Sequence, residues 1–340
     1  MYPTHDPSPG PSTEAPGRPS SGRPGGLSGD HRAARPAVLV VGASSGIGLA
    51  TARRLSARGA RLVLAARDPA ALDRTAAACR DAGAAATLVV PTDLTDPAQV
   101  EACVRAAVAA YGRLDAVVTT AQGMAYGTVE QVPREVFEHV VETAVHGTAH
   151  LVRATLPVFR AQGAGTLVVV SSLLAEVAVP SMSTYVTAKW GQLGLVRSLQ
   201  LELRDEPGLH VCLVSPGAID TPIYDEAATY AGSRGSAPPP VVGPDRVARA
   251  VERCLDHPRR RHVEVGPANL ATILGFRLAP FVYDRVVGPA VRAVVLRGPA
   301  VGPDGGNVLE AAPGGHTERG VWTLLGRRRT REGSGARWRR

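Results

Sequence analysis

Short apolar runs alternate with longer stretches rich in alanine and arginine from residue 36 onward. The apolar runs predict strands at 37–41, 61–66, 86–91, 114–120, 166–172, 209–215 and 261–265. Six of the seven have unbroken apolar stretches, which is typical of strands covered by helices on both faces. The segments between them are long enough for crossover helices and include 47–58, 69–82, 97–111, 134–162, 184–205 and 244–257. This alternation predicts an α/β fold with a doubly wound, Rossmann-like parallel sheet of about seven strands, in a single domain at 36–268.

The segments on either side of this domain differ from it in composition. Residues 1–35 are dominated by Pro, Gly, Ser and Arg, and such a segment cannot bury enough apolar surface to offset its chain entropy, so we expect it to be disordered. Residues 269–296 are apolar, but four charged residues and two prolines interrupt them too often for a membrane span. We expect a helical extension there, acting as a lid over the substrate site, a subunit contact or a peripheral membrane anchor. We expect 297–340 to be a basic, disordered tail.

Positive charge is concentrated in this last segment. The 340 residues carry a formal net charge of +8, and 297–340 hold nine arginines against four acidic residues. A basic tail is usually solvated, so nucleic acid is not an expected partner, and binding of RNA or anionic lipid through the tail stays as an alternative. No signal-peptide pattern is seen, and the widely spaced cysteines, without metal-ligand spacing, are typical of small buried residues in a reducing compartment. We therefore expect a cytoplasmic protein without a metal site.

A glycine-rich turn follows the first predicted strand. The stretch VLVVGASSGIGLA places Gly42, Gly46 and Gly48 between this strand and the first helix. Glycines allow a tight turn there, and the N-terminus of a helix offers free N–H groups to a pyrophosphate. The spacing differs from the G-x-G-x-x-G fingerprint and resembles the G-x-x-x-G-x-G turn of the short-chain dehydrogenase/reductase family. The resemblance covers residues 36 to about 265, and the cofactor-binding residues that it implies are Gly42, Ser44, Ser45, Gly46, Ile47, Gly48, Arg67, Asp93, Leu94, Tyr185, Lys189, Pro216, Gly217, Ile219 and Thr221.

The end of the second predicted strand favours one cofactor over the other. In the stretch LAARD, Ala66 stands where NAD-preferring enzymes present an acidic residue to the ribose 2′-OH, and Arg67 follows it. An arginine suits a 2′-phosphate because it forms charge-assisted hydrogen bonds. We therefore expect NADP(H), with NAD(H) as the alternative; an exposed arginine at a strand end is the other interpretation of Arg67.

The stretch STYVTAKWG contains Tyr185 and, four positions later, Lys189, which is the only lysine among the 38 basic residues. Their spacing with Ser172 is the most specific part of the resemblance, which implies that these three are the catalytic residues. Tyr185 would transfer a proton to or from the substrate oxygen, Ser172 would orient that oxygen, and Lys189 would stabilise the phenolate and bind the nicotinamide ribose. An ammonium about 4 Å from the phenol is worth up to roughly 4 kcal/mol at an effective dielectric constant of about 20, which predicts a lowered tyrosine pKa.

Two departures from the family pattern matter for the site. Gln122, in the stretch TTAQ after the fourth predicted strand, stands in the position of a glycine. Ala144 stands where the family has an asparagine that anchors a water leading to the lysine. His146 lies about 200° further around the helix and cannot simply replace that asparagine.

The sequence therefore predicts an NADP(H)-dependent oxidoreductase that interconverts a ketone or aldehyde and an alcohol, with Tyr185 as the acid/base. The resemblance implies a homodimer or homotetramer and a small-molecule carbonyl or alcohol as substrate. Steroid, lipid, polyketide and xenobiotic carbonyls all remain open, because no motif identifies the substrate. The alternative is a non-catalytic dinucleotide sensor or scaffold of the same fold, which Gln122 and Ala144 suggest.

Overall fold

Seven parallel strands form the central sheet. The computed structural model describes residues 35–311 and 317–329. The strands are β1 (Ala37–Val41), β2 (Arg61–Ala66), β3 (Ala86–Pro91), β4 (Ala116–Thr119), β6 (Gly165–Val170), β7 (Leu209–Pro216) and β9 (His262–Val265). They lie in the order β3-β2-β1-β4-β6-β7-β9, so the predicted α/β fold with a doubly wound parallel sheet is confirmed. In such sheets ligands bind at the carboxyl ends of the strands, where the strand order reverses, here between β1 and β4.

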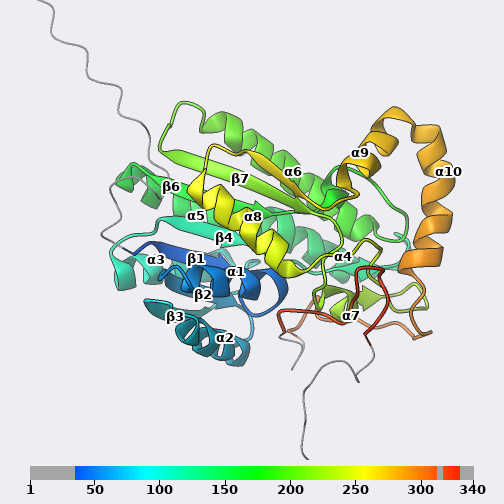
Figure 1. The fold of residues 1–340 in the computed structure, drawn as a ribbon, viewed down its shortest axis with the longest axis horizontal. Coiled ribbons are helices and arrows are strands. Elements are labelled where there is room, and N and C mark those ends of the chain that lie inside the picture. Colours follow the sequence, from blue (N-terminus) through cyan, green and yellow to red (C-terminus); the bar gives the residue numbers. More distant parts are fainter. Residues whose placement is uncertain (1–34, 312–316, 330–340) are drawn as a thin grey trace, which may run out of the picture.

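Helices cover both faces of this sheet (Figure 1). The main crossover helices are α1 (Gly46–Ser56), α2 (Pro69–Asp81), α3 (Pro97–Tyr111), α4 (Arg134–Val141), α5 (Gly147–Gln162), α6 (Ser183–Glu202) and α8 (Pro244–Asp256). Two of them begin alike: the carboxylates of Asp68 and Asp96 each accept two backbone N–H groups, and a proline follows each of them. Asp at the cap and Pro at the first helical position both favour helix initiation, which explains why the starts of α2 and α3 could be predicted.

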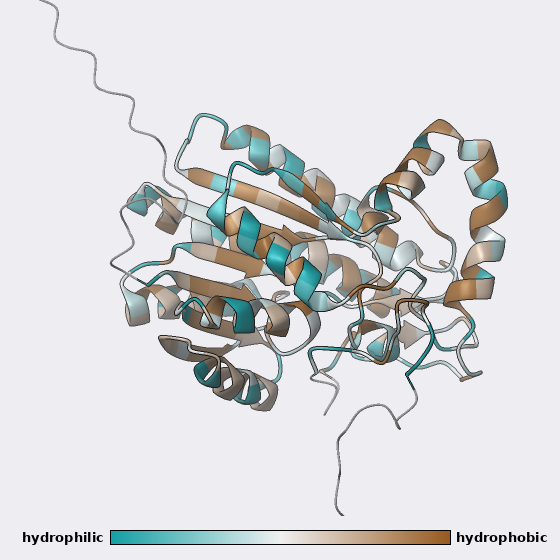
Figure 2. Ribbon diagram, viewed as in Figure 1, coloured by the Kyte–Doolittle hydropathy of each residue, from teal (hydrophilic) through white to brown (hydrophobic). Residues whose placement is uncertain are grey.

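The strands are apolar throughout because both of their faces are buried. Side chains of Val38 and Val40 on β1 pack in one core cluster, and those of Leu39 and Val41 pack in the cluster on the other side. Successive side chains of a strand point to opposite faces, so a sheet with two helical layers needs apolar residues at every position. Figure 2 shows this as strands coloured brown beneath helices that are partly teal.

The long central helix is interrupted. Instead of one helix over 134–162, α4 and α5 are joined by a π-helical turn at Glu142–His146. Ala144 lies in this turn, where its carbonyl oxygen accepts a hydrogen bond from Thr148 Oγ1 at 2.6 Å. Turns of this kind widen a helix locally and leave backbone groups available to other partners.

The apolar extension is helical and stands away from the body as an arch, shown in orange in Figure 1. It consists of α9 (Asn269–Leu278), α10 (Pro280–Ala290) and a final π-helical turn, η4 (Val291–Val295). Leu278 and Phe281, where the two helices meet, are 77% and 81% exposed. Within the described ranges, no helix has both the length and the apolar character that crossing a bilayer requires.

The segment after residue 297 differs from the expected disordered tail. Over 297–311 and 317–329 it packs against the body, with Val308 and Trp322 buried. The backbone N–H of Trp322 donates to the Asp220 carboxylate at 2.8 Å, and Arg329 pairs with the same carboxylate at 2.9 Å. Composition could not show this, because a few apolar anchors and the Asp220 carboxylate on the body decide it. Residues 1–34, 312–316 and 330–340 lie outside the described residues, and so does the disorder predicted for the N-terminal segment.

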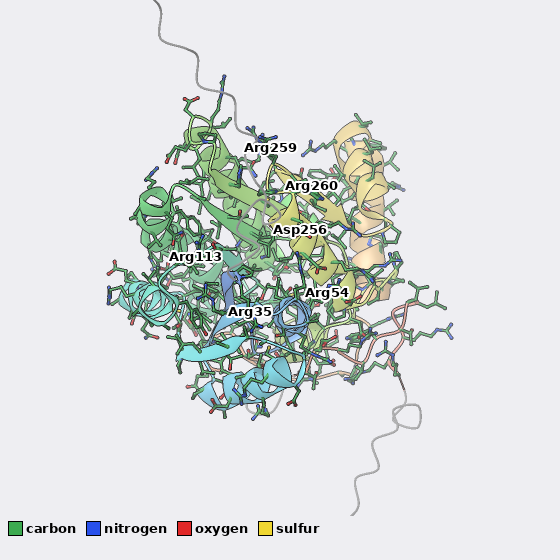
Figure 3. The ribbon with its side chains drawn as sticks, turned by 60° about the vertical axis from the view of Figure 1, so that its left-hand side comes forward. Arg35, Arg54, Arg113, Asp256, Arg259 and Arg260 are labelled. Carbon is green, nitrogen blue, oxygen red and sulfur yellow. The ribbon has the colours of Figure 1, made fainter. Side chains whose placement is uncertain are left out.

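Several arginines of the body lie at the edge of the sheet where the strands begin. Figure 3 shows Arg35, Arg113, Arg259 and Arg260 there, just before β1, β4 and β9. Arg54 on α1 forms ion pairs with Glu252 at 2.5 Å and Asp245 at 3.1 Å on α8. This basic edge is opposite the carboxyl ends of the strands, so it takes no part in the site described below.

Candidate active site

The structure brings Ser172, Tyr185 and Lys189 together beside the carboxyl end of β6. Ser172 follows this strand and begins a short 3₁₀ turn, where its Oγ accepts the N–H of Leu174 at 3.1 Å. Tyr185 and Lys189 lie one turn apart on α6, and Lys189 Nζ is 5.7 Å from the centre of the Tyr185 ring. Ser172 and Tyr185 can therefore act on one substrate oxygen, with Lys189 beside the tyrosine.

Burial sets the protonation of Tyr185 and Lys189. It raises the pKa of Tyr185 to about 12, and a hydrogen bond with Ser172 has a smaller, opposite effect. It lowers the pKa of Lys189 from 10.5 to about 7. The expected lowering of the tyrosine pKa is therefore wrong for this structure, because burial disfavours the phenolate more than the Ser172 hydrogen bond favours it. At neutral pH the phenol holds its proton, and the amine is poised between its two forms.

Gln192, one turn beyond Lys189 on α6, links the lysine to the π-helical turn. Lys189 Nζ donates to Gln192 Oε1 at 3.1 Å and to the carbonyl oxygen of Val170 at 3.3 Å. Gln192 Nε2 in turn donates to the carbonyl oxygen of Ala144 at 3.2 Å and to Thr148 Oγ1 at 3.1 Å. The side chains of Lys189, Gln192 and Thr148 are all buried, so these contacts are screened from water.

A second group of predicted residues lines a cleft at the carboxyl ends of β1, β2 and β4. Of the residues expected to bind the cofactor, the cleft is lined by Gly42, Ser44, Ser45, Gly46, Ile47, Arg67, Asp93, Leu94 and Thr221. The other six, Gly48, Tyr185, Lys189, Pro216, Gly217 and Ile219, do not line it. Gly48 lies against the turn, and Gly217 lines the neighbouring cavity described below.

The turn between β1 and α1 fits a pyrophosphate. Gly42 has a φ of +81°, which favours glycine, and a Cβ at Gly48 would lie only 2.0 Å from the carbonyl oxygen of Gly42. Ser45 precedes α1 without a side-chain hydrogen bond to it, so no side chain caps the first N–H groups of this helix. In the same cleft, Oε1 of Gln122 is buried and has no partner among the described residues. A bound dinucleotide could supply acceptor oxygens to the N–H groups of the helix and a donor to Gln122 Oε1.

The C-terminal segment crosses this cleft. The Arg67 guanidinium donates to three carbonyl oxygens of this segment, those of Asn307 at 2.6 Å, Val308 at 2.9 Å and Leu309 at 3.2 Å. The N–H of Gly46, at the start of α1, donates to the carbonyl oxygen of Thr317 at 2.9 Å. With this segment in place the cleft holds about 180 Å³, less than the roughly 300 Å³ of the smallest usual ligand pockets.

A larger cavity of about 700 Å³ lies next to this cleft. Ser172 and Tyr185 line it, and Ile223 lines both this cavity and the cofactor cleft. Part of its wall comes from α9, α10 and η4, so the arch covers the side chains of Ser172 and Tyr185. Of the three roles that the sequence left open for 269–296, this geometry matches a cover over the substrate site.

Several lining residues were not predicted. In the cofactor cleft they include Thr92, Thr120, His139, Thr143 and Glu226, and burial lowers the pKa of His139. Thr120 directly follows β4 and could have been found from its place at a strand end, whereas His139 and Thr143 carry no sequence signal. No cluster of three or more His, Cys, Asp or Glu suited to a metal is found in the ranges that the structure describes.

Comparisons with known proteins agree with this geometry. The profile of the short chain dehydrogenase family matches residues 36–230. An uncharacterised oxidoreductase of Bacillus subtilis, YxnA, is 30% identical over 253 residues, which cover 74% of this chain and 70% of the relative. The structure of a short chain dehydrogenase/reductase from Burkholderia phymatum in complex with NAD is 28% identical, with a TM-score of 0.65 and coverage of 75% of this chain and 96% of that one. An alcohol dehydrogenase from the archaeon Thermococcus sibiricus, complexed with 5-hydroxy-NADP, is 26% identical, with a TM-score of 0.60 and coverage of 68% and 96%.

Proposed function

The chain belongs to the short-chain dehydrogenase family, and from this premise we propose that it is an NADP(H)-dependent enzyme that interconverts a ketone or aldehyde and an alcohol. Oxidoreductase activity on CH–OH and C=O groups with a nicotinamide cofactor follows from membership of the family. The preference for NADP(H) and the roles of individual residues are the proposal. The observation that carries it is the meeting of Ser172, Tyr185 and Lys189: Lys189 lies beside the Tyr185 ring, and Ser172 and Tyr185 line the large cavity, which shares Ile223 with the cofactor cleft.

The cofactor, when bound, supplies or accepts the hydride. In carbonyl reduction, Ser172 holds the substrate oxygen by a hydrogen bond while Tyr185 donates its phenolic proton to that oxygen. With a pKa of about 12, the Tyr185 phenol is protonated at neutral pH and ready to act as the acid. The tyrosinate that forms is a stronger base than the Lys189 amine, whose pKa is about 7, so a proton passes favourably from this ammonium to the tyrosinate.

Arg67 supports NADP(H) because its guanidinium lies at the end of β2 and lines the cofactor cleft. It is already paired with three backbone carbonyl oxygens, so a phosphate must take the place of these neutral acceptors. A charge-assisted bond to phosphate is stronger than a bond to a carbonyl, and this exchange therefore favours the 2′-phosphate.

A carbonyl and alcohol screen with NADPH and NADH, read by cofactor absorbance, tests the proposal. We expect turnover with NADPH that Tyr185→Phe abolishes, because phenylalanine keeps the packing but has no transferable proton. Cofactor affinity, measured by protein fluorescence, should change little in this variant. Turnover that survives in Tyr185→Phe would show that the proton comes from another group, and cofactor binding without any turnover across the screen would favour the sensor or scaffold function.

The proposal includes a homodimer or homotetramer in the cytoplasm, as the resemblance implies. Sedimentation velocity of the full chain tests the assembly, since a single species with the mass of one 35.3 kDa chain would exclude it. Fractionation of the cells that make the protein tests the location.

A further inference from the structure

The cavity beside Tyr185 has an almost entirely apolar lining. Among the described residues, no Asp, Glu, Lys, Arg or His lines its 700 Å³. Apolar side chains come from the body, such as Met124, Leu174 and Met182, and from the arch, such as Val287 and Val291. A charged group inside such a cavity would lose its hydration without gaining a partner, which is costly.

The polar groups of this cavity are few, and most already have partners. Tyr283 donates its hydroxyl to the carbonyl oxygen of Ala178 at 2.8 Å, and Asn269 donates to the carbonyl oxygen of Ser215 at 3.0 Å. Ser172 and Tyr185 are therefore the polar pair that faces a reacting oxygen. The hydroxyl of Tyr126, a fully buried residue of the lining, has no partner in the part of the chain that the structure describes.

From this lining, and resting on the proposed function, we propose that the substrate is a neutral ketone or secondary alcohol with a large apolar body. The carbonyl lies at Ser172 and Tyr185, and the apolar body lies against the inner side of α10 and η4. A volume of about 700 Å³ is in the range of pockets for drug-sized ligands, so short ketones leave most of the wall uncovered. The arch is thus a specificity element: it supplies apolar surface that only the body of a large substrate contacts.

A homologous series from 2-butanone to 2-undecanone tests this inference. Each added methylene should raise kcat/KM with NADPH about threefold to fourfold until the cavity is filled, since burial of one methylene contributes about 0.8 kcal/mol. The matched acid, 10-oxoundecanoate, should react at least 100-fold more slowly than 2-undecanone. A flat series, or an equal rate for the acid, would overturn the assignment while leaving the oxidoreductase function in place.

Two variants locate the effect on the arch. Val287→Asp places a carboxylate on the cavity wall and should flatten the series, with a loss of tenfold or more for 2-undecanone. Leu278→Asp is the matched control, because this residue belongs to the same arch, is 77% exposed and does not line the cavity. Its series should have the wild-type slope, and equal effects of the two variants would refute the role of the inner wall.

Displacement of the neutral dye Nile red keeps this test separate from catalysis. If the cavity takes apolar ligands, 2-undecanone displaces the dye at far lower concentration than 2-butanone, whether or not NADPH is consumed. Displacement without turnover would mean that the substrate class stands and the proposed activity fails. Equal displacement by both ketones would mean that the substrate class is wrong.

A different observation carries a second inference, about the lysine. The geometry points to Gln192 as the positioning residue for Lys189. It would take over the role of the asparagine that the family has where this chain has Ala144. Its amide oxygen accepts from the ammonium, and its amide nitrogen is fixed by two acceptors, the carbonyl of Ala144 and the hydroxyl of Thr148. The π-helical turn makes the Ala144 carbonyl oxygen available to Gln192. Position 144 therefore contributes to the placement of the lysine through its backbone and not through its side chain.

Substitutions of Gln192 with opposite expected effects test this role. Gln192→Met removes an acceptor from the ammonium and should lower kcat about 10- to 100-fold, the loss typical of one hydrogen bond to a charged group, with little change in KM for NADPH. The basic limb of the pH-rate profile for reduction, where the ammonium loses its proton, should move to lower pH. Gln192→Glu places a carboxylate at the same distance and should move that limb to higher pH.

Gln200 provides the matched control. It is also a buried glutamine on α6, and its Nε2 donates to the carbonyl oxygens of Val211 at 2.9 Å and Arg261 at 2.7 Å, away from Lys189. Gln200→Met should lower the melting temperature without moving the pH-rate profile. If Gln192→Met and Gln192→Glu move the limb in the same direction, or not at all, Gln192 has only a structural role.

Discussion

Replacement of Lys189 by methionine should remove a pH dependence of stability that the wild-type protein shows above neutrality. The lysine is 1% exposed, and burial lowers its pKa from the ordinary 10.5 to about 7. Between these two values the unfolded chain holds a proton that the folded chain has lost. The unfolded state then binds more protons, so the free energy of unfolding rises with pH through this window.

The size of this rise follows from the pKa difference. At 1.36 kcal/mol per pH unit, the lysine contributes up to about 4 kcal/mol between pH 7 and pH 10. The acceptor oxygens of Val170 and Gln192 favour the ammonium and oppose the effect of burial, so this figure is an upper limit. Above pH 10 the raised pKa of Tyr185 reverses the trend, because the folded state then holds a proton that the unfolded state loses.

Urea unfolding followed by circular dichroism at pH 7, 8, 9 and 10 measures the effect. The contributions of all other groups cancel in the difference between wild type and Lys189→Met, which should grow in favour of the wild type as the pH rises. Parallel curves for the two proteins would refute the argument, because they would show that Lys189 keeps its proton when buried.

Three further outcomes follow from the structure. Arg67→Ala should reduce the preference for NADP(H) over NAD(H) by about 1.5 to 3 kcal/mol, the range for one charge-assisted contact, and an unchanged ratio of dissociation constants would exclude Arg67 as the phosphate ligand. Ala144→Asn should lower the free energy of unfolding by about 1 to 3 kcal/mol without faster turnover, because the side chain at 144 is fully buried in an apolar cluster; a faster enzyme would show that the new amide reaches the lysine. Glu318→Gln breaks the ion pair with Arg53 at 2.8 Å that helps to hold the C-terminal segment over the cleft, and it should tighten NADPH binding by about 1.4- to 5-fold, equivalent to 0.2 to 1 kcal/mol. Weaker binding in a titration of Glu318→Gln would mean that the segment assists the cofactor instead of competing with it.

Most of the fold could be predicted because its determinants are local. Apolar runs covered on both faces mark the strands of the sheet, and Asp-Pro pairs mark the starts of α2 and α3. The pairing of β5 (Ala125–Tyr126) with β8 (Ala228–Thr229) was missed, because strands of two residues carry no periodicity.

The site was predictable as far as its residues lie at strand ends or at fixed helical spacing. Tyr185 and Lys189 lie one turn apart, so their meeting needs only a helix. The role of Gln192 depends on a carbonyl oxygen 48 positions away, in a π-helical turn that no pattern announced. The C-terminal segment was missed for the same reason, since the partner of Trp322 is 102 positions distant.

The arginine bias of the chain gives its active site a chemical signature. Lys189 is the only lysine, so it carries the only side-chain amine, and its pKa of about 7 makes that amine nucleophilic under mild conditions. A neutral acylating reagent that reaches Lys189 would therefore modify this residue and no other side-chain amine. Bound dinucleotide should shield it, and peptide mapping would distinguish this adduct from one at the N-terminal α-amine, which titrates in the same range.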